Sequence, residues 1–148
     1  MPNQDFKDLL SAFNDAAVEY LVVGAHALAA HGHVRATKDL DVWVRPAAAN
    51  ARRTIEALRA FGAPLHAVRE SDFAVPGIML QIGVEPVRID IITAVDGLAF
   101  EPAWQNRVHA EYGGVPVFVL SKHDLIVNKR ASARPQDLAD VAALERGE

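Results

Sequence analysis

The chain has 148 residues, of which 51% are hydrophobic and 23% charged, and its formal net charge is -4. Such a composition is typical of one globular domain, which we expect to span residues 1–148. The acidic balance disfavours duplex nucleic-acid binding, and the absence of cysteine excludes disulfides and thiolate metal sites. No apolar run approaches the roughly 20 residues of a membrane span, and the N-terminus does not resemble a secretory signal. These features predict a cytoplasmic protein with no membrane partner.

The first half of the chain predicts helices that alternate with short strands. Apolar side chains spaced three or four residues apart indicate amphipathic helices, and short apolar or alternating runs indicate strands. The apolar run at 20–23 ends at Gly24, which is typical of a buried strand that feeds a turn. In chain order we expect helix 6–17, strand 20–23, helix 25–30, strand 39–44, a helix from Pro46 to Gly62, and a loop or irregular strand at 63–76.

The second half of the chain predicts two hairpins and two C-terminal helices. Gly113-Gly114 between two apolar segments is a strong hairpin signal, and Ser121 with Asp124 three residues later is typical of a helix start. We expect strands 77–82 and 86–93 joined at 83–85, helix 96–106, strands 108–112 and 115–120, a helix to residue 131, and a last helix from Pro135 with Leu138 on its apolar side. The predicted fold class is α/β (α+β), with a mixed β-sheet flanked by helices.

Three aspartates are the most informative residues. Asp39 and Asp41 alternate with apolar residues on one predicted strand, so their side chains share a face. Asp90 is the only acidic residue in the apolar run 87–92, where a charge is costly unless it is paired. Neighbouring carboxylates repel each other, and hard divalent cations bind oxygen ligands. The pattern predicts a site for two Mg²⁺ ions, or Mn²⁺ in their place, of the kind that clamps both oxygens of a phosphoryl-type displacement.

The turn at Gly24 adds a candidate phosphate site. A glycine between a strand and a helix lets the backbone approach a ligand, and the helix start offers N–H groups to a phosphate. We therefore expect a nucleoside triphosphate on this turn, joined to the aspartates through metal. Thr37 and Lys38 precede the aspartate strand and are candidates for phosphate or sugar contacts. The alternative is that Thr37 begins the strand and Lys38 is merely exposed.

These motifs carry a resemblance to a known family. The pattern consists of Gly24-Ala25, His31-Gly32, Arg35, Thr37, Asp39-Leu40-Asp41 and, in a later strand, Asp90. It resembles the DNA polymerase β-like nucleotidyltransferase superfamily, and more narrowly it is similar to small bacterial nucleotidyltransferases related to AbiEii-type toxins. The segments 120–126, Lys129 and 134–140 also resemble the tail of that group.

The resemblance implies transfer of a nucleoside monophosphate from a nucleoside triphosphate to an acceptor hydroxyl, with release of pyrophosphate. Asp39 and Asp41 would bind metal, Asp90 would help to activate the acceptor hydroxyl, and the backbone of Gly24 and Ala25 would hold the triphosphate. The acceptor is left open among a protein side chain, an RNA end and a small hydroxyl compound. Since the chain is short, a partner protein or a homodimer is expected to help recognise it.

Lys129 lies where the tail of the family supplies a basic residue to the phosphates. The alternative is a solvated helix lysine. Trp43 shares the strand face of the aspartates. Packing of its ring within the protein is favoured over stacking of the ring on a nucleotide base. His26 and His31 are five residues apart, a poor spacing for a shared metal site on one helix.

One departure from the family pattern supports a second hypothesis. The family usually has serine or a second glycine where Ala25 stands, and a serine hydroxyl bonded to a phosphate contributes roughly 1.5–3 kcal/mol. Its loss favours a weak or inactive nucleotide-binding module, such as a toxin–antitoxin component or an interaction partner of another protein. A phosphohydrolase with an aspartate nucleophile is a third hypothesis. It is less favoured, because its Asp-x-Asp motif follows a strand, whereas here the pair opens one.

Overall fold

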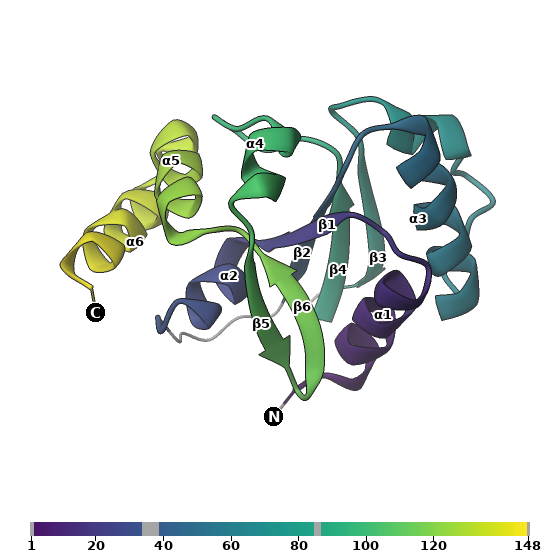
Figure 1. Cartoon of the computed structure of the whole chain (residues 1–148), viewed down its shortest axis with the longest axis horizontal. Helices are drawn as coiled ribbons and strands as arrows, with labels where there is room; N and C mark the ends of the chain where they lie inside the picture. The colour runs from purple at the N-terminus through teal and green to yellow at the C-terminus, as the bar shows by residue number, and fades with distance from the viewer. Residues whose placement is uncertain (1, 34–38, 85–86, 148) are drawn as a thin grey trace.

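The computed structural model describes residues 2–33, 39–84 and 87–147. In this part of the chain six strands form one mixed sheet in the order β3-β4-β2-β1-β6-β5, flanked by helices (Figure 1). The predicted fold class is therefore confirmed. The strands are β1 (Tyr20–Val23), β2 (Leu40–Val44), β3 (Met79–Val84), β4 (Val87–Ile92), β5 (Val108–Tyr112) and β6 (Val115–Val119). The helices are α1 (Gln4–Asp15), α2 (Gly24–Ala30), α3 (Ala48–Phe61), α4 (Phe100–Gln105), α5 (Lys122–Ser132) and α6 (Pro135–Arg146), with a 3-10 helix η1 (Glu70–Ala74).

Pairing in the sheet combines two antiparallel hairpins with parallel contacts at its centre. β3 pairs with β4 and β5 pairs with β6 as antiparallel hairpins, which confirms both hairpin predictions. The predicted link at 83–85 differs, because β3 continues to Val84, and residues 85–86 lie outside the described part of the chain. β2 is antiparallel to β1 but parallel to β4. The parallel contact between β2 and β4 determines which side chains meet across these two strands.

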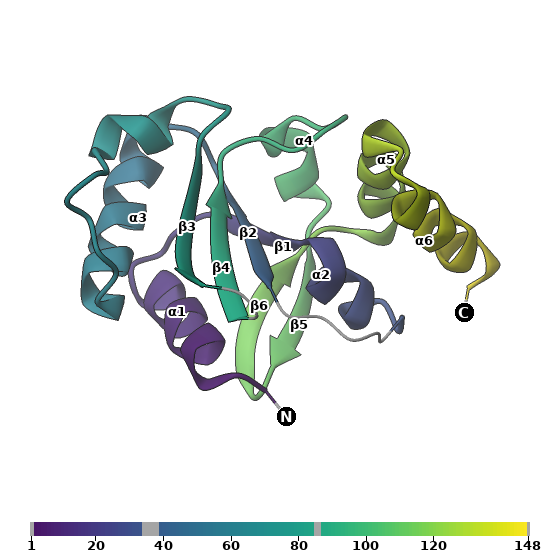
Figure 2. The ribbon, with the colours of Figure 1, turned by 180° about the vertical axis from the view of Figure 1, so that it is seen from behind.

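One face of the sheet is covered by α1 and α3, which lie on the same side in both views (Figures 1 and 2). Helix α1 buries Phe6, Leu9, Leu10 and Phe13 on one stripe. The ring of Phe13 packs edge-on against Tyr20 of β1, with 5.7 Å between ring centroids. Tyr20 is the register partner of Val44, so the alternate β2 residues Leu40, Val42 and Val44 belong to this buried face. Burying such apolar area is the main source of stability in a domain of this size.

The opposite face carries α4 and the side chains that alternate with this apolar set. Trp43 is buried against Phe100 of α4, with 5.0 Å between the ring centroids in an edge-to-face arrangement. The packing interpretation of Trp43 is therefore confirmed. The pair formed by α5 and α6 lies on this side of the molecule, beyond α2 (Figure 2). Among the described residues, no helix is long and apolar enough to span a membrane.

Five local predictions were wrong. The helix expected over 96–106 covers only Phe100–Gln105. Helix α3 begins two residues after Pro46, since Ala47 is still extended and caps it. Asp39 precedes β2, which starts at Leu40. The segment 63–76 contains η1, which buries the ring of Phe73 completely. Leu138 is exposed because the buried positions of α6 are Asp137, Asp140, Val141 and Leu144, two of them charged.

Candidate active site

The parallel pairing of β2 and β4 brings the three predicted aspartates together. Asp41 is the register partner of Asp90, and Leu40 is the partner of Ile89. Laterally paired residues project their side chains on the same face of a sheet, so Asp41 and Asp90 lie side by side. Asp39 directly precedes β2, and its Oδ2 lies 3.3 Å from Nη2 of Arg88, whose guanidinium also contacts Asp90. We refer to Asp39, Asp41 and Asp90 as the carboxylate cluster.

Arg88 completes this cluster, and the sequence had assigned it no role. It lies two residues before Asp90 on β4 and therefore shares its face. Its Nε donates to Asp90 Oδ1 at 2.9 Å and its Nη2 donates to Asp90 Oδ2 at 3.2 Å. The same Nη2 lies 3.3 Å from Asp39 Oδ2. Charge-assisted contacts of this two-pronged kind are the strong ones, so Arg88 is the counter-ion of the cluster in the absence of metal.

The carboxyl groups remain electrostatically stressed in spite of Arg88. Burial, then the charge of Asp90, a hydrogen bond shared with Asp90 and the charge of Asp39 raise the pKa of Asp41 to about 7, while Arg88 acts in the opposite sense. Asp39 Oδ1 is buried and has no hydrogen-bond partner among the described residues. Such an oxygen has lost its hydration with nothing in return. An added cation would relieve both defects.

The three carboxylates are the kind of ligand that a hard divalent cation prefers, but they are not arranged around a common metal position. Carboxylate oxygens are the ligands that Mg²⁺ and Mn²⁺ prefer, and an orphaned oxygen of Asp39 is available beside Asp41. In the described ranges no group of three or more His, Cys, Asp or Glu side chains is already arranged to hold a metal ion. The guanidinium of Arg88 contacts oxygens of both Asp39 and Asp90.

Gly24 stands against the carboxylate cluster, as the sequence predicted for a close approach of the backbone. Its φ is +69°, and a Cβ placed on it would lie 2.5 Å from Asp41 Oδ2. Only glycine fits such a position without displacing the carboxylate. Ala25 follows in the first turn of α2, where backbone N–H groups have no intrahelical acceptor. The turn therefore places backbone donors next to Asp41.

Lys129 is not the solvated lysine of the alternative interpretation. Only 4% of it is exposed, and its Nζ lies 2.9 Å from Asp140 Oδ2 and 3.5 Å from Asp137 Oδ1. Its buried charge thus ties α5 to α6. Thr37 and Lys38, the other predicted nucleotide contacts, lie outside the described residues, as does Arg35 of the family pattern.

Arg134 lies at the start of α6 and is one of several exposed cations of the C-terminal helices. Its side chain is mostly exposed, while Asp137 is buried and receives Nε at 2.7 Å and Nη2 at 3.2 Å. Burial alone would raise the pKa of Asp137, but hydrogen bonds from Arg134 and Ser132 outweigh it and lower that pKa to about 2. The hydrogen bond with Asp137 raises the pKa of Arg134, and the charges of Asp41 and Asp96 contribute. Arg134 is therefore held within electrostatic reach of the cluster.

Contacts between α5 and the loop after β4 explain how Arg134 reaches this place. Asn128 Nδ2 of α5 donates to the carbonyl oxygen of Asp96 at 2.9 Å. A Cβ placed on Gly97 would lie 2.7 Å from Cβ of Ala131. This loop follows the strand that carries Asp90, so α5 is anchored to the segment that leaves that strand.

The histidines near the site are occupied by packing and backbone contacts. The ring of His26 packs between Phe6 and Tyr112, and burial lowers its pKa, with Asp39 acting in the opposite sense. His31 Nε2 lies 2.8 Å from the carbonyl oxygen of Leu120. His26 therefore serves in packing, and His31 contacts the backbone.

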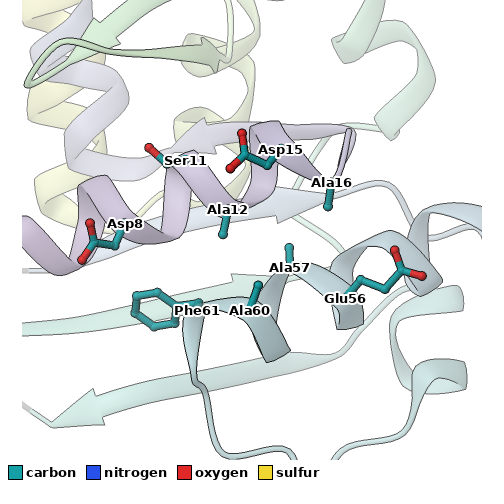
Figure 3. A pocket seen from close by; sticks show the side chains of 9 residues that line it. All are labelled: Asp8, Ser11, Ala12, Asp15, Ala16, Glu56, Ala57, Ala60 and Phe61. Carbon is teal, nitrogen blue, oxygen red and sulfur yellow. The ribbon is translucent and has the colours of Figure 1, made fainter.

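A separate groove of about 500 Å³ lies between α1 and α3 (Figure 3). Its rim carries Asp8, Asp15 and Glu56, and its floor is lined by small residues such as Ala57. An acidic rim with no metal-binding carboxylate triad repels a polyphosphate.

Comparisons with known proteins concern the family and the fold of the chain. The family described as "Nucleotidyltransferase of unknown function (DUF6036)" matches residues 3–145. A search of curated proteins finds no match. Among solved structures, the lincosamide antibiotic adenylyltransferase LnuA, bound to lincomycin, is similar with a TM-score of 0.63 and 14% identity, over 99% of this chain and 98% of that one. A putative nucleotidyltransferase from Thermotoga maritima has a TM-score of 0.59 and 14% identity, over 95% and 88%.

A third similar structure is the antibiotic-resistance factor ANT(2'')-Ia. Its TM-score is 0.60 and its identity 18%, over 97% of this chain and 80% of that one. At these identities the likeness to solved structures establishes the fold, and the family match over nearly the whole chain establishes the relationship. The narrower link to AbiEii-type toxins stays a prediction.

Proposed function

The chain belongs to the DUF6036 nucleotidyltransferase family, and from that premise we propose that it transfers a nucleoside monophosphate from a nucleoside triphosphate to a hydroxyl group, with Asp39, Asp41 and Asp90 binding divalent cations. The observation that carries this proposal is the convergence of three carboxylates on paired strands beside the Gly24 turn. Mg²⁺, or Mn²⁺ in its place, would supply charge neutralisation on the phosphates and a Lewis acid for the transferred group.

On the donor side, three features favour a triphosphate. The backbone at Gly24 and Ala25 offers N–H donors beside Asp41. Arg134 adds an exposed guanidinium held in orientation by Asp137, and such a planar fork suits phosphate oxygens. We assign the phosphate contact of the tail to Arg134, and to Lys129 the supporting role of fixing Asp137. Thr37 and Lys38 remain candidates for the same anionic group.

On the acceptor side, Asp90 is the candidate base for the attacking hydroxyl. Its neighbour across the β3–β4 pairing is Gln81, which is exposed on the edge strand. The neutral amide of Gln81 can donate a hydrogen bond to the acceptor substrate or accept one from it, and it does not require that substrate to be charged. Two structural neighbours are named for antibiotic modification or resistance, which supports a small hydroxyl compound as acceptor ahead of a protein or an RNA end.

The direct test uses each of the four α-³²P-labelled nucleoside triphosphates with Mg²⁺ and a size-fractionated cell extract. We expect label to pass to a small-molecule fraction with one triphosphate, and to be lost in Asp41→Asn and on addition of a chelator. Label on protein or RNA would keep the transferase and change the acceptor class. If no fraction is labelled with any triphosphate, even at high protein concentration, nucleotidyl transfer is refuted.

The second candidate function is nucleotide binding without transfer, within a toxin–antitoxin pair or another complex. Two observations favour it: Ala25 has no hydroxyl for a phosphate, and Arg88 holds both oxygens of Asp90. Binding of a triphosphate with Mg²⁺, without any labelled product, is the result that this alternative predicts.

A further inference from the structure

The guanidinium of Arg88 contacts both carboxylate oxygens of Asp90 and one oxygen of Asp39. Both oxygens of Asp90 receive a nitrogen of Arg88, at 2.9 and 3.2 Å, and 8% of the Asp90 side chain is exposed. Arg88 contacts Asp39 through Oδ2, at 3.3 Å, while Asp39 Oδ1 is buried and has no hydrogen-bond partner in the part of the chain that the structure describes. The cluster therefore offers a free oxygen at Asp39, next to Asp41, but none at Asp90.

The arrangement has a consequence for the order in which cations enter. A cation that binds Asp90 must break a two-pronged charge-assisted contact and must also lie next to a fixed positive charge. A cation bound between Asp39 and Asp41 uses the orphaned oxygen and leaves the contact with Asp90 in place. With three carboxylates and one guanidinium, the formal charge of the four side chains is about -2 when all are ionised, which one divalent cation neutralises.

We propose that Arg88 is an internal counter-ion that keeps Asp90 closed to metal, so that the metal-free site takes one divalent cation, at Asp39 and Asp41, and Asp90 becomes a ligand only after Arg88 leaves it. This inference rests on the proposed function and concerns how its site is assembled. The charge of a bound triphosphate supplies the new partner, because guanidinium pairs with phosphate oxygens as well as with carboxylates. Assembly of the complete site is thereby coupled to the arrival of nucleotide.

The test is a titration of the full chain with Mn²⁺, without nucleotide, in which free Mn²⁺ is followed by electron paramagnetic resonance. The variants are Arg88→Gln and Arg88→Lys, and the matched control is Arg130→Gln, which removes an exposed arginine paired with Glu145. The wild type and the control are expected to bind one Mn²⁺. Arg88→Gln is expected to bind a second Mn²⁺, or the first about tenfold more tightly.

Each outcome decides a different claim. Equal stoichiometry and affinity in the wild type and Arg88→Gln, with binding lost in Asp41→Asn, would overturn the role of Arg88 and leave the metal site standing. No Mn²⁺ binding in either protein, with or without ATP, would overturn the metal-dependent function itself. Should Arg88→Gln not fold, as shown by circular dichroism, Arg88→Lys decides in the same manner, because an ammonium cannot hold both oxygens of Asp90 in the two-pronged geometry.

Discussion

Asp41 and Asp90 are register partners on two parallel strands, so their carboxyl groups project side by side from one face of the sheet. Burial, and then the charge of Asp90, raise the pKa of Asp41 to about 7. A protein that only needed stability would place apolar side chains at these positions. The retained repulsion indicates a site built to accept positive charge.

The pH dependence of cation binding follows from this pKa. A cation binds the ionised carboxylate, so below about pH 7 each Mn²⁺ must displace the proton of Asp41. We expect the affinity for Mn²⁺ to rise roughly tenfold per pH unit between pH 5 and 7 and to level off above pH 7. Calorimetric titration in buffers of different ionisation enthalpy measures the released proton directly. A flat profile across this range contradicts the assignment of Asp41 as a ligand.

Stability without metal should change in the opposite direction with pH. The pKa of Asp41 in the folded protein lies above its ordinary value of 3.8, so its contribution to stability is complete below pH 4 and is lost as the pH rises to about 7. Asp41→Asn should therefore raise the free energy of unfolding at pH 8 by about 1–4 kcal/mol and leave it nearly unchanged at pH 4. Urea unfolding at the two pH values tests this. The exposed Glu56 provides the control Glu56→Gln, for which a change within about 0.5 kcal/mol is expected.

Substitution of Gly24 tests the close approach of the backbone to Asp41. In Gly24→Ala the new Cβ would lie 2.5 Å from Asp41 Oδ2, at a φ of +69°. The carboxylate must move, so we expect loss of Mg²⁺-dependent ATP binding by fluorescence titration. Gly114→Ala is the matched control: its φ is +88°, but no atom lies within 4 Å of the added Cβ. Both variants carry left-handed backbone strain of about 1 kcal/mol. Equal ATP affinity in the two variants would show that the contact is irrelevant to the site.

Arg134 is predicted to bind the phosphates. Arg134→Ala should weaken ATP binding roughly tenfold, the loss of one charge-assisted contact, with little effect on Mn²⁺ binding in the absence of nucleotide. Arg130→Ala, in the neighbouring helix and also exposed, serves as the control for net charge. An Arg134→Ala protein that binds ATP like the wild type would remove this residue from the site.

Lys129 is predicted to stabilise the packing of α5 against α6 and not to contact the phosphates directly. Lys129→Met leaves the buried Asp137 and Asp140 without their shared cation, so the free energy of unfolding should fall by about 3–5 kcal/mol. The exposed Lys122 supplies the control Lys122→Met, with an expected change within about 0.5 kcal/mol. A Lys129→Met protein of normal stability that has lost ATP affinity would instead support a direct phosphate contact.

Local patterns were sufficient to predict most elements and the carboxylate cluster. The alternation of aspartate with apolar residues predicted that Asp39 and Asp41 share a face. The position of Asp90 as the only acidic residue in an apolar run predicted a buried charge. The helix capped by Ser121 begins as expected, with Ser121 Oγ accepting from the N–H of Asp124 at 3.1 Å. In each case the signal lies within a few residues of the position that it describes.

Features that depend on pairing between distant segments were not predicted. Arg88 is an unremarkable strand residue until the register of β2 with β4 places it beside Asp39. The burial of Lys129 depends on Asp137 and Asp140 of the following helix, which no local period reveals. The 3-10 turn around Phe73 is likewise held by burial of one ring. Tertiary packing decides such positions against their local propensity.

The most direct test of the central claim is the anomalous difference density of a crystal grown with Mn²⁺ and a non-hydrolysable ATP analogue. We predict Mn²⁺ peaks between Asp39, Asp41 and Asp90, with the polyphosphate lying over the turn at Gly24. Mn²⁺ and nucleotide bound elsewhere, with Arg88 still paired to Asp90 and the carboxylate cluster vacant, would contradict the account.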